Sequence, residues 1–134
     1  EGQTEFAGTL THGAVAQCLA ESDVLLAPSV VAGDGDREGA PTVLKEASAS
    51  QAVPIATHHG GIPEIIEDGR TGFLVPERDV AALEKHLTLL LADPDLRTRM
   101  GQAARAKMER ECDVRACVAE LERRYDEALR LFGE

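Results

Sequence analysis

The first half of the chain alternates short apolar runs with helical patterns, as expected of βα units that form a parallel sheet. The apolar runs predict about four strands, at residues 6–8, 24–27, 54–57 and 73–75. The patterns between them predict helices at residues 11–21 and 41–51 and a short helix at 63–66. The predicted fold class is therefore α/β, with a Rossmann-like parallel sheet and flanking helices.

From about residue 79 the pattern changes to charged, amphipathic helix. The first such helix ends where Asp93 is followed by proline, and a second runs over 95–110. Asp113 can cap a last helix. The apolar face of this last helix is Val114, Val118, Leu121, Tyr125, Ala128 and Phe132. We interpret 1–134 as a single truncated domain with a helical C-terminal part over about 79–132.

Composition narrows the range of partners. The chain has 24 acidic and 14 basic residues and a formal net charge of −10. A nucleic-acid interface needs a basic surface to neutralise phosphates, so a nucleic-acid partner is not expected. No apolar run approaches the ~18 residues of a membrane span. Three cysteines without a CxxC pair favour a reducing, cytoplasmic setting.

Residues 33–46 hold the most informative chemistry. Gly39 and Ala40 are small, so another molecule can approach the backbone closely there. The predicted helix start leaves the amides of Thr42 and Val43 unpaired at the positive end of the helix dipole. These features form a candidate anion site suited to a diphosphate, although every helix start offers free amides.

Two carboxylates, Glu38 and Glu46, stand eight residues apart in the same segment. Glu38 precedes the helix, and Glu46 lies about one turn inside it. A carboxylate at a βα junction can accept hydrogen bonds from paired hydroxyl groups, as with the ribose in dinucleotide-binding folds. The junction can therefore hold a phosphate, a ribose and a sugar. Glutamate is also common in first turns without any ligand.

Segment 38–47, Glu-Gly-Ala-Pro-Thr-Val-Leu-Lys-Glu-Ala, resembles the E-x7-E motif of group 1 (family 4) glycosyltransferases. Segments 59–64 and 68–75 resemble further motifs of that family in order and spacing, and 6–10 resembles its F-x-G-x-L strand. The resemblance covers nearly the whole chain. It implies a retaining enzyme of GT-B fold, of which this chain is a partial C-terminal, donor-binding half. Loop 28–39, with its Asp-Gly-Asp insertion, is similar to the subgroup that builds colanic acid and other exopolysaccharides.

The resemblance also implies roles for individual residues. The full-length enzyme would transfer a hexose from a nucleotide-diphosphate sugar to a glycan or lipid-linked acceptor, with retention, in polysaccharide biosynthesis. Glu38 would be the catalytic residue, contacting sugar hydroxyls near the reacting carbon; the motif leaves open whether it is a nucleophile or a positioning group. Glu46 would bind the ribose, the amides of Thr42 and Val43 the diphosphate, and the backbone of 39–40 would line the sugar pocket. No metal and no cofactor beyond the donor substrate are implied.

Parts of the family's machinery lie outside this chain. The N-terminal acceptor domain is missing, as is the region that supplies an Arg/Lys pair to the diphosphate. No lysine or arginine precedes Arg37. Charge-assisted contacts are the stronger ones, so we expect the isolated fragment to bind donor weakly and to transfer nothing. The full-length enzyme would be cytoplasmic, at the inner face of the membrane if its acceptor is lipid-linked.

Two departures from the family pattern concern the helix after the motif's first glutamate. Pro41 has no N–H, so one amide donor near the anion site is absent. Gln51 stands where the family has a helix-ending glycine, which carries a cost if its φ is positive.

Several alternatives remain open from the residues alone. Asp34 and Asp36 resemble a DxD or the start of a calcium loop, but Lys45 stands where that loop needs its bidentate glutamate. His58 and His59 are adjacent in a turn, so their side chains diverge rather than form a ligand pair. A non-enzymatic assembly module, dimerising through an open sheet edge, is one alternative function. A GT-B epimerase or phosphorylase is another. The nucleotide, sugar and acceptor stay undetermined.

Overall fold

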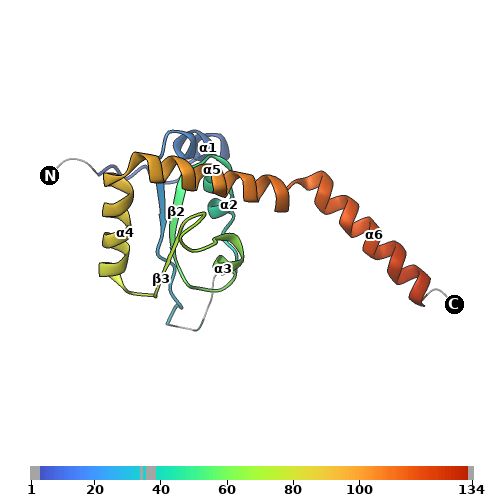
Figure 1. Cartoon of the computed structure of the whole chain (residues 1–134). Helices are drawn as coiled ribbons and strands as arrows, with labels where there is room; N and C mark the ends of the chain where they lie inside the picture. Colours follow the sequence, from blue (N-terminus) through green and yellow to red (C-terminus); the bar gives the residue numbers. More distant parts are fainter. Residues whose placement is uncertain (1–3, 34, 36–38, 133–134) are drawn as a thin grey trace.

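The computed structural model describes residues 4–33, 35 and 39–132. Helices and strands alternate up to the third strand, after which the described chain is helical (Figure 1). The elements in order are α1 (His12–Ala20), β1 (Val24–Ala27), α2 (Thr42–Ala49), β2 (Val53–Thr57), α3 (Ile62–Ile65), β3 (Phe73–Val75), α4 (Val80–Ala92), α5 (Pro94–Glu111) and α6 (Val114–Phe132). Thr11 begins α1 as predicted, because its side chain accepts a hydrogen bond from the amide of Ala14.

The sheet is parallel, in the order β1-β2-β3. Val24 aligns with Val53, and Ile55 aligns with Phe73. All five residues of β2 are buried, as expected of a central parallel strand covered on both faces. The predicted α/β class and parallel sheet are therefore confirmed.

The strand predicted at residues 6–8 is wrong, and the described residues form three strands rather than about four. The segment is irregular, Phe6 is 94% exposed, and Gly8 has a φ of +63°. A positive φ lies outside the extended region. No neighbouring strand pairs with this segment in the described part of the chain, and a strand without a partner gains no ladder hydrogen bonds.

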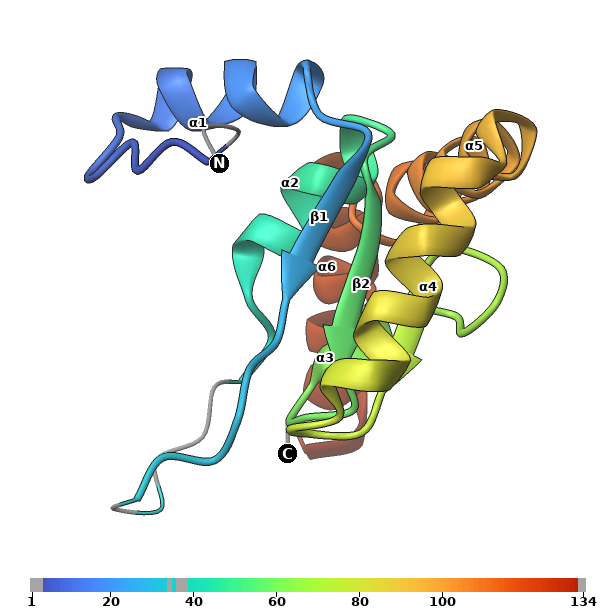
Figure 2. The ribbon, with the colours of Figure 1, turned by 90° about the vertical axis from the view of Figure 1, so that its left-hand side faces the viewer.

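Each strand contributes alternate residues to two cores on opposite faces of the sheet. Figure 2 shows α2 and α4 on either side of the strands. On the α2 side, Leu44 packs with Ala56 and with Met108 of α5. On the α4 side, Ile55 packs with Leu90 and Met100. Helix α5 contributes to both cores and so links the two layers.

Helix α2 ends in a Schellman turn that leads into β2. The amide of Ala52 donates to the carbonyl of Ala47 at 3.0 Å, and the amide of Gln51 donates to Ser48 at 3.2 Å. Gln51 has a φ of +67°, a conformation that favours glycine, and it stands where the family pattern has glycine. A methyl group at Gly101 of α5 would overlap the Gln51 carbonyl oxygen, so the two segments approach closely here.

Helix α6 extends away from the sheet (Figure 1), and none of its residues is buried. It begins at Asp113, whose carboxylate accepts from the amides of Arg115 and Ala116 at 2.9 and 3.0 Å. Its predicted apolar positions run from Val114, 70% exposed, to Phe132, 84% exposed. The apolar pattern is therefore present but uncovered. Within the described residues, no helix is long and apolar enough to cross a membrane.

Candidate functional site

Three loops meet at one edge of the sheet, because the carboxyl ends of parallel strands lie together. They are the segment between β1 and α2, the turn after β2 and the turn after β3. Figure 2 shows all three at the lower edge of the sheet in that view. Open α/β sheets bind their ligands at this edge. The residues proposed from the sequence lie on the first of these loops and on α2.

The start of α2 leaves amide groups uncapped. Pro41 occupies the N-cap position, has no side-chain cap, and accepts a hydrogen bond from the amide of Leu44 at 3.1 Å. The amides of Thr42 and Val43 make no hydrogen bond within the described part of the chain. Thr42 is exposed and Val43 is half-buried. Within the described residues these two amides thus lack a partner, at a helix start where the dipole favours an anion.

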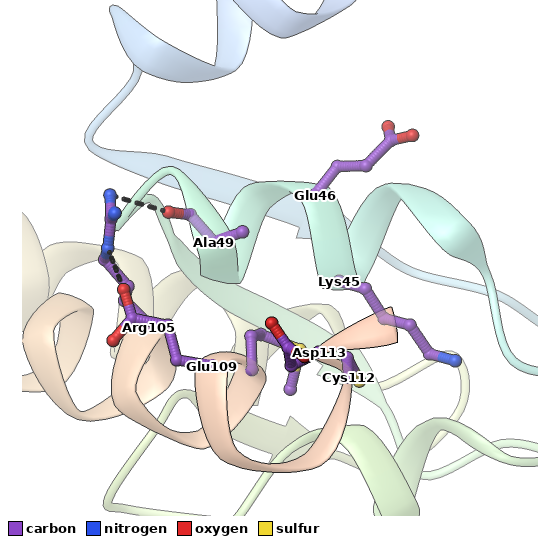
Figure 3. A pocket seen from close by; sticks show the side chains of 8 residues that line it. Lys45, Glu46, Ala49, Arg105, Glu109, Cys112 and Asp113 are labelled. Atoms are coloured by element: carbon purple, nitrogen blue, oxygen red, sulfur yellow. Dashed lines mark hydrogen bonds and ion pairs between the residues drawn. The ribbon is translucent and has the colours of Figure 1, made fainter. Parts of the chain in front are cut away.

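Glu46 lies one turn into α2. Its side chain is 31% exposed, and its Oε1 atom is 3.9 Å from Nδ1 of His12 on α1. Figure 3 shows the carboxylate pointing away from α5, on the side of α2 that faces α1. The structure thus places this carboxylate on the same helix as the free amides, about 6 Å further along the axis at 1.5 Å per residue.

The turn after β2 packs directly against Gly39 and Ala40. The amide of Gly61 donates to the carbonyl of Gly39 at 2.7 Å. A Cβ atom at Gly61 would lie 3.1 Å from that oxygen and 3.2 Å from Cβ of Ala40. The two-glycine turn of the sequence is therefore a close support for the backbone that we expect to line a sugar pocket.

Glu38, the predicted catalytic residue, lies outside the described residues, as do Asp34 and Asp36. The structure therefore describes one of the two carboxylates of the motif. Among the residues that it does describe, no group of three or more histidine, cysteine, aspartate or glutamate side chains could hold a metal ion.

The sequence analysis missed a pair formed by the buried His59 and the half-buried Glu77. The His59 side chain is 1% exposed, and its Nδ1 atom lies 2.6 Å from Oε1 of Glu77. Oε2 of Glu77 accepts from the amide of Val31 at 3.1 Å. The hydrogen bond with His59, followed by that from Val31, lowers the pKa of Glu77. His58 is exposed, so the prediction that the two histidines diverge is confirmed.

A signal for this pair existed in the sequence. His59 follows β2, and Glu77 follows β3, so both stand just beyond the carboxyl ends of strands. Once the two strands are known to be neighbours, their following residues are expected to meet. The sequence alone does not reveal which strands are adjacent.

A groove of about 370 Å³ runs between α2 and α5. Its lining includes Lys45, Glu46 and Ala49 of α2 and Met108 of α5, and Arg105 of α5 donates to the Ala49 carbonyl at 3.3 Å. Figure 3 shows Glu46 among the residues that line the groove, with its carboxylate pointing away from α5. The free amides of α2 do not line it. The groove therefore adjoins the predicted site at Glu46 but does not include the start of α2.

Comparison with known proteins identifies the family. Residues 1–107 match the family "Glycosyl transferases group 1". The chain is 37% identical over 122 residues to an Escherichia coli K12 protein named "Putative colanic acid biosynthesis glycosyltransferase WcaL", covering 90% of this chain and 30% of that protein. It is 43% identical over 93 residues to the amylovoran biosynthesis glycosyltransferase AmsK of Erwinia amylovora, covering 69% and 23%. The chain thus spans 30% or less of the length of these relatives.

Solved structures of glycosyltransferases have the same fold as this chain. Sucrose-phosphate synthase of Thermosynechococcus elongatus superposes with a TM-score of 0.81 at 25% identity, over 95% of this chain and 30% of that one. The C-terminal domain of a group 1 glycosyl transferase family protein of Francisella tularensis superposes with a TM-score of 0.70 over 81% of this chain and 53% of that one. The family resemblance of the motifs is confirmed, and the fold is that of GT-B C-terminal domains. This chain belongs to the group 1 glycosyl transferase family.

Proposed function

We propose that this chain is the donor-binding part of a cytoplasmic enzyme that transfers a hexose from a nucleotide-diphosphate sugar to a glycan or lipid-linked acceptor. The reaction retains the anomeric configuration and serves polysaccharide biosynthesis. One observation carries the proposal: in a chain of this family, α2 begins with two amides that have no partner among the described residues, and a carboxylate follows one turn later. A nucleoside diphosphate needs an anion site and a hydroxyl acceptor at such a separation.

The diphosphate is assigned to the start of α2. Its negative charge would accept from the amides of Thr42 and Val43 and be stabilised by the helix dipole. Pro41 has no backbone N–H, so the amides of Thr42 and Val43 are the first backbone donors of the helix. Backbone amides alone make modest contacts, and charge-assisted ones are about twice as strong. The remainder of the full-length protein is therefore expected to supply cationic side chains.

The ribose is assigned to Glu46. A carboxylate accepts up to two hydroxyl hydrogen bonds, which suits the adjacent 2′ and 3′ hydroxyls of a ribose. Half-burial limits competition from water, and Nδ1 of His12 lies 3.9 Å from the carboxylate. The 6 Å rise between the amides and this carboxylate (~1.5 Å per residue) fits one ligand that spans both.

The sugar is assigned to the space beside Gly39 and Ala40. Side chains this small let the hexose approach the backbone, and Gly61 supports that backbone from behind. Glu38 would contact the sugar hydroxyls and position the reacting carbon. The bond from the anomeric carbon to the diphosphate oxygen breaks as the acceptor oxygen bonds to the same face of that carbon. The acceptor's hydroxyl proton passes to the departing diphosphate, which carries away the electron pair.

The test uses the full-length protein. Saturation-transfer NMR against a set of nucleotide sugars should detect one bound donor in the wild type. Glu46→Ala should weaken that binding, since a charged hydrogen-bond partner is lost, by about tenfold or more. Glu109→Ala, on α5, is the matched control and should leave binding unchanged.

Product analysis tests the stereochemistry. The anomeric proton coupling of the first-formed product should match that of the donor, as retention requires. A folded wild-type protein that binds no nucleotide sugar would refute the proposed function. Equal loss in both glutamate variants would refute the assignment of the ribose.

A further inference from the structure

The segment between β1 and α2 is held by side chains that follow the other two strands. Oγ1 of Thr57, the last residue of β2, donates to the carbonyl of Ser29 at 2.5 Å. Oε2 of Glu77, just after β3, accepts from the amide of Val31 at 3.1 Å. The chain from β1 therefore leaves the sheet along a course set by β2 and β3. That segment continues in sequence to Glu38.

Glu77 joins two loops through its two oxygens. While Oε2 holds Val31, Oε1 lies 2.6 Å from Nδ1 of His59. The lowered pKa of Glu77, caused first by the hydrogen bond with His59, makes it a carboxylate at neutral pH. A carboxylate only accepts, so Nδ1 of His59 carries the proton. One side chain thus connects the loops that follow all three strands.

The other ring nitrogen distinguishes this histidine from a packing residue. Nε2 of His59 is buried and has no hydrogen-bond partner within the described residues. Burying an unpaired polar atom is unfavourable, so an aliphatic side chain would fill the same space at lower cost. The use of an imidazole here is explained by its bond to Glu77 and not by packing.

We propose that the His59–Glu77 pair is a positioning device that holds the loop after β1 in register with α2 for sugar transfer. This inference rests on the function proposed above. The contacts assigned to the diphosphate and the ribose are on α2, and the side-chain hydrogen bonds of the pair go to Val31 and to each other rather than to α2. The pair therefore acts on transfer of the sugar and leaves nucleotide affinity unchanged.

The kinetic test compares His59→Leu and Glu77→Ala with His58→Leu in the full-length enzyme, with the donor found by the NMR screen. His59→Leu keeps the buried volume, and His58→Leu changes the neighbouring exposed histidine as the control. In the two pair variants kcat should fall about 10- to 100-fold, the range expected when reacting groups shift by up to ~1 Å. Calorimetry should give a Kd for the matching nucleoside diphosphate within about threefold of wild type, less than ~0.7 kcal/mol.

A conservative variant separates positioning from packing. The amide N–H of His59→Asn can still donate to Glu77, so this variant should recover much of the kcat that His59→Leu loses. An unchanged kcat in His59→Leu would overturn the inference. So would a parallel loss of kcat and nucleotide affinity that His59→Asn does not restore.

Amide exchange tests the device without any donor. The Val31 amide should exchange about tenfold or more faster in Glu77→Ala, because its acceptor is gone, while exchange in β2 stays slow. Unchanged protection of Val31 would overturn the inference even if transfer is observed. If Val31 responds but the wild type binds no nucleotide sugar, the proposed function fails, and the pair's link to transfer fails with it.

Discussion

Gly61 offers a direct test of how closely the turn after β2 supports the proposed sugar pocket. In Gly61→Ala the added Cβ would lie 3.1 Å from the Gly39 oxygen and 3.2 Å from Cβ of Ala40, whereas ordinary contacts there are 3.4–4 Å. Gly39 and Ala40 are exposed, so they can move outward. The required movement is a few tenths of an ångström.

The effect on stability should be small. The 2.7 Å hydrogen bond from the Gly61 amide to Gly39 would lengthen, at a cost below the ~0.5–1.5 kcal/mol of a whole bond. Replacing glycine also reduces the freedom of the unfolded chain, which offsets about 0.4–1 kcal/mol. The free energy of unfolding should therefore change by less than about 1 kcal/mol.

The effect of Gly61→Ala on the rate of sugar transfer should be easier to measure than its effect on stability. If a ~1 Å misplacement costs about 100-fold, a shift of about 0.3 Å costs roughly fourfold in kcat/KM. Initial-rate kinetics of the full-length enzyme measure this, with urea unfolding as the check on folding. Gly13→Ala on α1 is the control, because a Cβ there meets nothing within 4 Å. An unchanged kcat/KM in Gly61→Ala, or an equal loss in the control, would refute the reasoning.

Three further predictions concern stability and charge. Gln51→Gly should raise the free energy of unfolding by about 0.5–1 kcal/mol, measured by urea unfolding. Glycine removes the ~1–2 kcal/mol strain of the left-handed backbone, which exceeds the ~0.4–1 kcal/mol cost of a more flexible unfolded state. A lower free energy of unfolding would contradict this. Lys107→Met should destabilise by about 1–3 kcal/mol, because the Glu64 carbonyl loses the buried ammonium that donates to it at 2.9 Å, and an unchanged unfolding midpoint would count against it. The carboxyl of Glu120 should titrate by NMR with a pKa of about 2, below its usual 4.5, because of hydrogen bonds led by that from Arg123. Because the pKa is lowered, the hydrogen bonds between Glu120 and Arg123 stabilise α6 above about pH 4.5, and this stabilisation is lost as the pH falls toward 2. A titration midpoint near 4.5 would show that these hydrogen bonds do not form.

Local sequence patterns predicted most elements well. The strand at 24–27 was predicted with its observed bounds, because an uninterrupted apolar run ended by proline has few other interpretations. Thr11, Asp93 and Asp113 were predicted to mark helix boundaries and do so, since a cap bonds within its own first turn. The family pattern marked position 51 as one that usually holds glycine, and Gln51 there has a positive φ.

Patterns that depend on distant partners were less informative. The strand predicted at 6–8 is irregular, because a strand exists only where another strand pairs with it. The apolar face of α6 was predicted, but its exposure was not, since a helical pattern does not specify what covers it. The side of α2 on which the Glu46 carboxylate lies also became known only with α1 and α5 in place.

The sequence by itself determined the βα order, the helix boundaries and the motif with two glutamates, because these depend on residues that are close in the chain. Only the tertiary structure decided that His59 meets Glu77 and that Gly61 supports Gly39. The reason is the order and register of the sheet. They bring the ends of β1, β2 and β3 to one edge, and no local pattern records which strands become neighbours.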